Sequence, residues 1–153
     1  MPIPPSTNIR PATEADLAGI ETLVSSAYGK YIERIGRKPR PMLADYCDAH
    51  ANHQLWVLEQ DHELVAVLEL IPHSTHLLIE NVAVSPQYQG LGLGRQLMLF
   101  AESEAKHKGY CEIRLYTNER FTENLAIYAK LGYRETHREP FHGTDLVHMS
   151  KAI

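Results

Sequence analysis

The chain contains little that suits a secreted, membrane-spanning or nucleic-acid-binding protein. Cysteine occurs only twice in 153 residues, at Cys47 and Cys111, too few for the disulfide framework of a small secreted domain. No apolar run approaches the roughly 18 residues that a membrane-spanning helix needs. A formal net charge of −4 argues against a basic nucleic-acid-binding surface. We therefore expect a cytoplasmic protein with two free thiols.

The residues that are present are typical of one globular domain. Hydrophobic residues make up 44% and charged residues 22% of the chain, an ordinary mixture for a globular fold. Residues 1–6 lack the basic and apolar regions of a signal peptide. No repeat or linker divides the remainder, so we expect a single domain over residues 1–153.

Hydrophobic periodicity predicts both strands and helices. The expected strands are residues 8–10, 55–59, 64–70, 77–84, 113–117, 132–139 and 145–151. The expected helices are residues 14–31, 42–52, a stretch ending at Lys108, and 122–131. The short link after the third helix implies that the strands on either side of it are parallel. The pattern predicts an α/β fold with helices on a mixed sheet.

The most informative stretch runs from Glu80 to Gly94, where a strand, a glycine-rich turn and a helix follow one another. The strand is almost continuously apolar and ends at Pro86, which has no N–H for a sheet ladder. Gly90, Gly92 and Gly94 then precede an amphipathic helix. A helix start supplies free N–H groups and a positive dipole end. The stretch predicts a pyrophosphate site, with a ligand-free glycine turn as the alternative.

Two common phosphate-binding loops do not fit this stretch. A P-loop needs a lysine and a Ser or Thr after its last glycine, and no such lysine follows. The dinucleotide fingerprint fails because Arg95 occupies the place of its third glycine, although Glu112 has about the spacing of a ribose-binding acid. The pattern Gln/Arg-x-x-Gly-x-Gly/Ala remains, and it fits without a mismatch.

With Val82-Ala83-Val84 in front of it, this pattern resembles the acyl-CoA signature of the GNAT superfamily of N-acetyltransferases. The resemblance covers most of the chain. It implies a mostly antiparallel mixed sheet with helices on both faces and a central parallel pair that splays around the pantetheine arm, with a bulge in the first of the two strands. It implies that acetyl-CoA is held at Val82, Ala83, Val84, Gln89, Gly90, Leu91, Gly92, Leu93, Gly94 and Arg95.

A second match lies downstream, where Asn124 and Tyr128 precede Gly132-Tyr133 with the spacing of a GNAT segment. Residues four apart share a helix face, so both side chains can point into one cleft. The resemblance implies that Asn124 binds the pantetheine arm and that Tyr128 protonates the departing thiolate. The alternative is that Tyr128 is a core aromatic residue with its hydroxyl at the surface.

Acyl transfer to an amine needs the uncharged amine. A lysine-like amine costs roughly 4–5 kcal/mol to deprotonate at pH 7, and a base offsets that cost. Glu80 interrupts an apolar strand, where an unpaired charge is expensive, and some GNAT relatives use a glutamate at this place as the base. The alternative is a carboxylate at the cleft rim or paired with a cation.

The hairpin before this strand suggests a carboxylate pair. If residues 73–76 form a four-residue loop, Glu69 faces Glu80 across the two strands. Facing carboxylates repel each other, so the pKa of one should rise, or a cationic substrate should bridge them. A register slip of one residue would remove the contact.

The tract from Tyr28 to Met42 lies where GNAT proteins line their acceptor site, so Tyr28, Tyr31 and Arg34 join Glu69 and Glu80 as expected substrate-binding residues. Its arginines could hold a substrate carboxylate, although such a charged tract is more often simply solvated. The Cys and His spacings around residues 47–53 and 73–76 do not converge on a zinc site, so no metal is expected.

We therefore expect an acetyl-CoA-dependent N-acetyltransferase that acts on a primary amine of a small molecule or peptide by direct attack in a ternary complex. No cysteine lies near the glycine turn for an acyl-enzyme, because Cys111 looks like a core residue of the next strand. A catalytically silent acyl-CoA sensor of the same fold and an enzyme with a longer acyl donor are the alternatives. The resemblance is also compatible with a homodimer.

Overall fold

The computed structural model describes residues 7–153. Its strands are β1 (Thr7–Pro11), β2 (Gln54–Gln60), β3 (Glu63–Pro72), β4 (Leu77–Val84), β5 (Glu112–Asn118), β6 (Arg134–Phe141) and β7 (Thr144–Ala152). Its α-helices are α1 (Leu17–Tyr28), α2 (Ile32–Ile35), α3 (Arg40–Leu43), α4 (Tyr46–Asn52), α5 (Leu93–His107) and α6 (Thr122–Lys130). Short 3₁₀ turns are η1 (Glu14–Asp16), η2 (Gly29–Tyr31) and η3 (Pro86–Tyr88).

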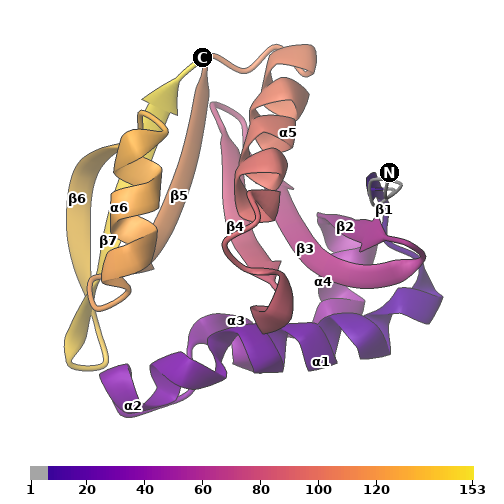
Figure 1. Cartoon of the computed structure of the whole chain (residues 1–153). Helices are drawn as coiled ribbons and strands as arrows, with labels where there is room; N and C mark the ends of the chain where they lie inside the picture. Colours follow the sequence, from indigo (N-terminus) through magenta and orange to yellow (C-terminus); the bar gives the residue numbers. More distant parts are fainter. Residues whose placement is uncertain (1–6) are drawn as a thin grey trace.

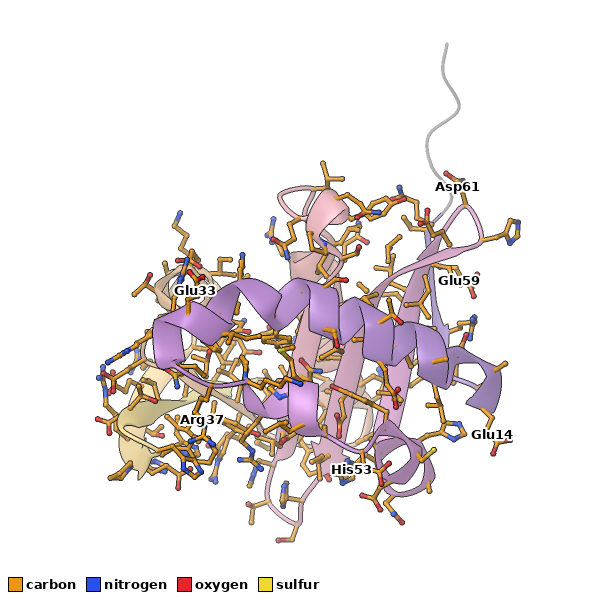
Figure 2. All side chains as sticks on the ribbon, turned by 90° about the horizontal axis from the view of Figure 1, so that it is seen from below. Glu14, Glu33, Arg37, His53, Glu59 and Asp61 are labelled. Carbon is orange, nitrogen blue, oxygen red and sulfur yellow. The ribbon has the colours of Figure 1, made fainter. Side chains whose placement is uncertain are left out.

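The strands form one seven-stranded sheet in the order β1-β2-β3-β4-β5-β7-β6. All neighbours are antiparallel except β4 and β5, which are parallel. Helices α5 and α6 lie on one face, and α1 crosses the sheet on the other (Figures 1 and 2). The predicted fold class, a mostly antiparallel mixed sheet with a central parallel pair and helices on both faces, is confirmed.

The two faces of the sheet carry separate hydrophobic cores. Side chains alternate along a strand, so Leu58 and Leu68 join the core beneath α5, whereas Val57 and Val67 join the core beneath α1. All four are fully buried, and burying each such side chain stabilises the fold by about 1.5–3 kcal/mol. The two cores therefore fix α5 and α1 on opposite faces of the central strands.

Three local predictions need correction. The expected helix 42–52 is two helices, α3 and α4, because Ala44 is extended and Asp45 caps a new start by accepting a hydrogen bond from the Asp48 amide at 3.1 Å. The expected helix 14–31 is helical throughout but has 3₁₀ turns at both ends. Cys111 is exposed and lies just before β5, so it is not a core residue.

The central parallel pair is short and splays apart. Strands β4 and β5 pair only from Leu77–Ile113 to Ile79–Leu115, and beyond this point the two ribbons diverge toward α1 (Figure 1). The β3–β4 register shifts here, which leaves Glu80 without a partner residue on β3 and forms a β-bulge. The divergence leaves the β5-facing edge of residues 80–84 without a partner strand, and the carbonyls of Val82 and Val84 instead accept hydrogen bonds from the side chains of Tyr28 and Gln89.

The bulge overturns the prediction that Glu69 faces Glu80. Pro72 faces Leu77 as the four-residue loop requires, but the extra residue on β4 brings Asn81 opposite Glu69. The predicted pairing requires an unbroken ladder from the loop onward, and a bulge moves every later pair by one.

Candidate active site

Two hollows meet where β4 and β5 diverge. The outer groove, with a volume of about 530 Å³, lies between the end of β4, the glycine turn, α5 and α6. The inner pocket, with a volume of about 60 Å³, lies deeper between the strands and the segment 35–41. The two hollows share Tyr28, Val82, Asn124 and Tyr128, so a molecule in one can reach a molecule in the other.

The outer groove contains most of the residues that the sequence predicted for acyl-CoA. Those that line it are Val82, Ala83, Val84, Gln89, Gly90, Gly92, Leu93, Gly94, Arg95, Asn124 and Tyr128. Leu91 does not line it, and its side chain points to solvent with 64% of its surface exposed.

The glycine turn has the backbone geometry that glycine allows. Gly90 and Gly92 have φ angles of 79° and 83°, in the left-handed region that other residues avoid. Gly92 is also the N-cap of the 15-residue helix α5, and no side chain caps that helix start. The first N–H groups of α5 and its positive dipole end therefore face the groove, a suitable cradle for a pyrophosphate.

Helix α6 brings Asn124 and Tyr128 to the junction of the two hollows, as their spacing predicts. Burial, with a smaller contribution from Tyr31, raises the pKa of Tyr128 to about 12. Its ring lies edge-on to Tyr133 with a centroid distance of 6.2 Å. Within residues 7–153 its hydroxyl makes no hydrogen bond, so this proton donor faces the junction.

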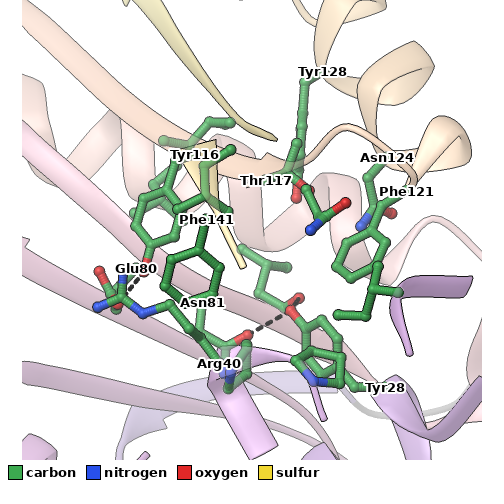
Figure 3. Close-up of a pocket in the computed structure, with 18 residues that line it drawn as sticks. Tyr28, Arg40, Glu80, Asn81, Tyr116, Thr117, Phe121, Asn124, Tyr128 and Phe141 are labelled. Carbon is green, nitrogen blue, oxygen red and sulfur yellow. Dashed lines mark hydrogen bonds between the residues drawn. The ribbon is translucent and has the colours of Figure 1, made fainter. Parts of the chain in front are cut away.

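Glu80 lies in the inner pocket, where the bulge presents its carboxylate (Figure 3). The Tyr116 hydroxyl, from β5, donates to Glu80 Oε1 at 2.5 Å. Burial and the negative charge of Glu80 raise the pKa of Tyr116 well above its usual value. Tyr116 therefore remains a donor at neutral pH and holds the carboxylate in one orientation.

A buried hydrogen-bond network fixes the residue after Glu80. Asn81 is 4% exposed, and its Oδ1 accepts from the Tyr28 hydroxyl at 2.7 Å. Its Nδ2 donates to the Tyr46 hydroxyl at 3.2 Å, and Tyr46 donates to the carbonyl of Pro41 at 2.7 Å. Satisfied buried polar groups specify one arrangement, so the network ties the bulge to α1 and to the α3 segment.

Glu69 lies in a side pocket that Glu80, Asn81, His53 and Arg40 also line. It is 4% exposed, and its Oε2 lies 2.7 Å from His53 Nδ1. Burial raises the pKa of Glu69, the hydrogen bond to His53 opposes that shift, and the charge of Glu80 adds to it. The expected rise in the pKa of one carboxylate therefore falls on Glu69, chiefly because of burial.

The remaining predicted substrate-binding residues differ in position. Tyr28 lines both hollows. Tyr31 lines the outer groove and stacks on Phe121 with a centroid distance of 4.0 Å. Arg34 forms an ion pair with Glu123 at 2.7 Å and lies outside both hollows.

Sequence reasoning missed several residues of the inner pocket, among them Asn81, Tyr116, Phe121 and Phe141. Asn81 is a second polar residue in an apolar strand, a signal that was present but unused. Phe141 has no such local signal. Its strand β6 reaches the pocket only because β6 pairs with β7 and β7 pairs with β5. Arg40 is one of several arginines in the tract from Tyr28 to Met42, and no local pattern in the sequence distinguishes it from the others.

Residues 7–153 contain neither a cluster of metal-ligating side chains nor a membrane-spanning helix. No group of three or more His, Cys, Asp or Glu side chains in this part of the chain could hold a metal ion. None of its helices has the length and apolar character needed to cross a membrane.

Known proteins share both the sequence pattern and the fold. Residues 51–135 match the sequence model of the acetyltransferase (GNAT) domain. A mycothiol acetyltransferase of Kocuria rhizophila is 36% identical over 56 residues, which cover 37% of this chain and 18% of that protein. The chain therefore spans only a small part of this relative's length.

Two solved structures superpose over nearly the whole chain. The ribosomal-protein-S18-alanine N-acetyltransferase of Escherichia coli has a TM-score of 0.80 and 19% identity, covering 97% of this chain and 94% of that one. The PaiA N-acetyltransferase of Thermoplasma acidophilum, crystallised with coenzyme A, has a TM-score of 0.74 and 21% identity, with coverages of 97% and 99%. At these identities the likeness concerns the fold alone.

Proposed function

Because the chain belongs to the GNAT family of acetyltransferases, we propose that it transfers an acetyl group from acetyl-CoA to a primary amine of a small molecule or peptide. One observation carries this proposal. The splay of β4 and β5 joins a groove with an uncapped helix start to a pocket with a carboxylate, and Tyr128 lies at the junction.

The outer groove is suited to coenzyme A, which the similar Thermoplasma protein binds. The amides of Gln89 to Arg95 would hold the pyrophosphate at the start of α5. The main chain of Val82 to Val84, which has no partner strand on its β5 side, would hold the pantetheine arm, together with Asn124. When bound, acetyl-CoA supplies an activated thioester. Its acetyl end would lie at the junction of the two hollows.

Glu80 would take the proton from the acceptor ammonium, directly or through water. Deprotonating a lysine-like amine at pH 7 costs roughly 4–5 kcal/mol, and a positioned base offsets part of that cost. The hydrogen bond from Tyr116 leaves the second carboxylate oxygen of Glu80 available. Neither Cys47 nor Cys111 lines the two hollows, which supports direct attack by the amine rather than an acyl-enzyme.

Tyr128 would stabilise the departing thiolate. Its pKa of about 12 keeps it protonated at neutral pH. Complete proton transfer to a thiolate of pKa near 8.5 would then be uphill by roughly 5 kcal/mol. We therefore assign Tyr128 a hydrogen bond to the sulfur, and the thiolate takes up a proton from solvent as the products leave. We also propose a cytoplasmic location, which two exposed free thiols favour.

The test combines binding with turnover. Calorimetry should detect binding when coenzyme A is titrated into the protein. A thiol-release assay with acetyl-CoA should detect transfer to at least one member of a panel of amino acids, polyamines, peptides and aminoglycosides. Absence of coenzyme A binding would overturn the proposal, and binding without transfer to any amine would instead indicate a silent acyl-CoA sensor.

A further inference from the structure

The inner pocket contains one positive and one negative side chain. Among the described residues that line it, only Arg40 and Glu80 are charged, and the others are apolar, aromatic or neutral polar. Figure 3 draws both on the same side of the pocket, next to Tyr116. A pocket with one charge of each sign complements a ligand that also carries one charge of each sign.

Arg40 has no acidic partner in the part of the chain that the structure describes. Its guanidinium lies over the rings of Tyr116 and Phe141, at 5.2 and 5.8 Å from their centroids. By contrast, Arg34 pairs with Glu123 at 2.7 Å. The rings orient the planar guanidinium without using its hydrogen-bond donors, so those donors are free for an anion.

The position of Arg40 is tied to the position of Glu80. Arg40 lies between Pro39 and Pro41 at the start of α3, and the carbonyl of Pro41 accepts the hydrogen bond from Tyr46. Tyr46 in turn accepts a hydrogen bond from Asn81, the neighbour of Glu80. Tyr116 contacts both charged groups, through its hydroxyl and its ring. The two charges are therefore held by one connected set of contacts.

We propose that Arg40 binds the anionic group of a zwitterionic acceptor whose amine faces Glu80. The acceptor class is a small primary amine with a carboxylate or phosphate near the amine, because a guanidinium binds either group with paired hydrogen bonds. This inference rests on the proposed acetyltransferase function and names the substrate class of the same pocket.

The hollows around the two charges have room for a small acceptor and its side chain. The inner pocket of about 60 Å³ has room for roughly four to six water-sized spheres, enough for the reacting end of a small molecule. Two neighbouring hollows of about 310 and 560 Å³ are also lined by Arg40 and Glu80. An acceptor side chain can extend into them while the two charged groups remain bound.

The test compares acceptors that differ only in the anionic group. Each α-amino acid is assayed against its decarboxylated amine, and O-phosphoethanolamine against ethanolamine, by thiol release from acetyl-CoA. We expect the unmodified protein to prefer the anionic member of at least one pair. Arg40→Gln should lower kcat/KM for that member by about 10- to 100-fold, mainly through KM, and leave the matched amine unaffected. Arg40→Lys should restore part of the loss.

Arg37→Gln is the matched control. Arg37 also lies over Phe141, at 5.6 Å from the ring centroid, but it lines neither the inner pocket nor the outer groove. Figure 2 shows it beside the β6–β7 hairpin. Equal losses in the Arg37 and Arg40 variants, or no preference for any anionic acceptor, would overturn the inference.

A binding titration separates this inference from the proposed function. The preferred anionic amine is titrated calorimetrically into the protein and into the Arg40→Gln variant, each saturated with coenzyme A. Weaker binding to the variant supports the role of Arg40 even if turnover is slow. Acetylation that is independent of Arg40 overturns the inference alone. Failure to bind coenzyme A overturns the proposed function. In that case the anionic amine is titrated into the protein and the Arg40→Gln variant without coenzyme A, and weaker binding to the variant shows that Arg40 holds the anion, whereas equal binding overturns the inference as well.

Discussion

At the scale of single residues, Glu80 is the group whose replacement should affect the chemistry most. It lies at the β4 bulge and accepts the 2.5 Å hydrogen bond from Tyr116. Glu80→Gln keeps the shape and the acceptor oxygen but cannot take up a proton. We expect kcat to fall by about 10²- to 10⁴-fold, with little change in the KM for acetyl-CoA.

The measurement is kcat against pH for Glu80→Gln and for Glu69→Gln. Glu69 pairs with His53 and does not line the inner pocket, so its replacement should have the smaller effect. If the two pH profiles matched that of the unmodified protein, neither carboxylate would be the base.

Tyr128 allows a second test at this scale. Tyr128→Phe removes only the hydroxyl at the junction of the two hollows, and we expect kcat to fall by about 10- to 100-fold because a hydrogen bond to a charged group is lost. Affinity for coenzyme A should hardly change. Tyr133→Phe is the control, because that hydroxyl donates to Glu102 at 3.3 Å, outside both hollows. Equal kinetic effects of the two variants would contradict the role of Tyr128.

At the scale of elements, the turn between β4 and α5 depends on the backbone conformation of Gly92. A Cβ there would meet no atom within 4 Å, but φ is 83°, so Gly92→Ala should lower the free energy of unfolding by about 1–2 kcal/mol through backbone strain alone. Coenzyme A binding should weaken as the start of α5 shifts. Urea unfolding and calorimetry measure the two effects.

Gly19→Ala is a control for which we expect the change in the free energy of unfolding to have the opposite sign. Gly19 is exposed within α1, and its Cβ would also meet nothing within 4 Å. Because glycine is a poor helix former, this change should raise the free energy of unfolding by about 1 kcal/mol and leave binding unchanged. A stabilising Gly92→Ala would show that the turn does not require the left-handed conformation.

At the scale of the whole molecule, carboxylates whose pKa values fall on folding make stability depend on pH. Hydrogen bonds from Arg114 and Ser150 lower the pKa of Glu112 from 4.5 to about 2, and Arg10 lowers the pKa of Asp16 well below its usual value. A carboxylate with a lowered folded-state pKa contributes stability above its unfolded-state pKa and loses that contribution as pH falls through the folded-state value.

We therefore expect the free energy of unfolding to decrease as pH falls from 4.5 toward 2, the two pKa values of Glu112. Urea unfolding at a series of pH values measures this dependence. Asp16→Asn should reduce stability at neutral pH and flatten the decrease. Glu33→Gln, at an exposed position of α2, should change neither quantity. If the free energy of unfolding of Asp16→Asn decreased equally steeply as pH falls, the Arg10–Asp16 pair would not contribute to the pH dependence.

Much of the fold was predictable because its signals are local. The apolar run of β4, the glycines before α5 and the amphipathic face of α5 each follow from neighbouring residues. Predictions failed where one residue changed the local geometry. Asp45 started a new helix where one continuous helix was expected, and the bulge at Glu80 shifted the partner of Glu69 to Asn81.

The sequence by itself determined the family, the groove-lining glycine turn and the helical pair Asn124 and Tyr128, because each depends on residues a few positions apart. Only the tertiary structure decided which side chains share the inner pocket with Glu80. Tyr116, Arg40 and Phe141 come from β5, α3 and β6. Their convergence depends on strand order and on the divergence of β4 and β5, and long-range packing of this kind leaves no short-range pattern in the chain.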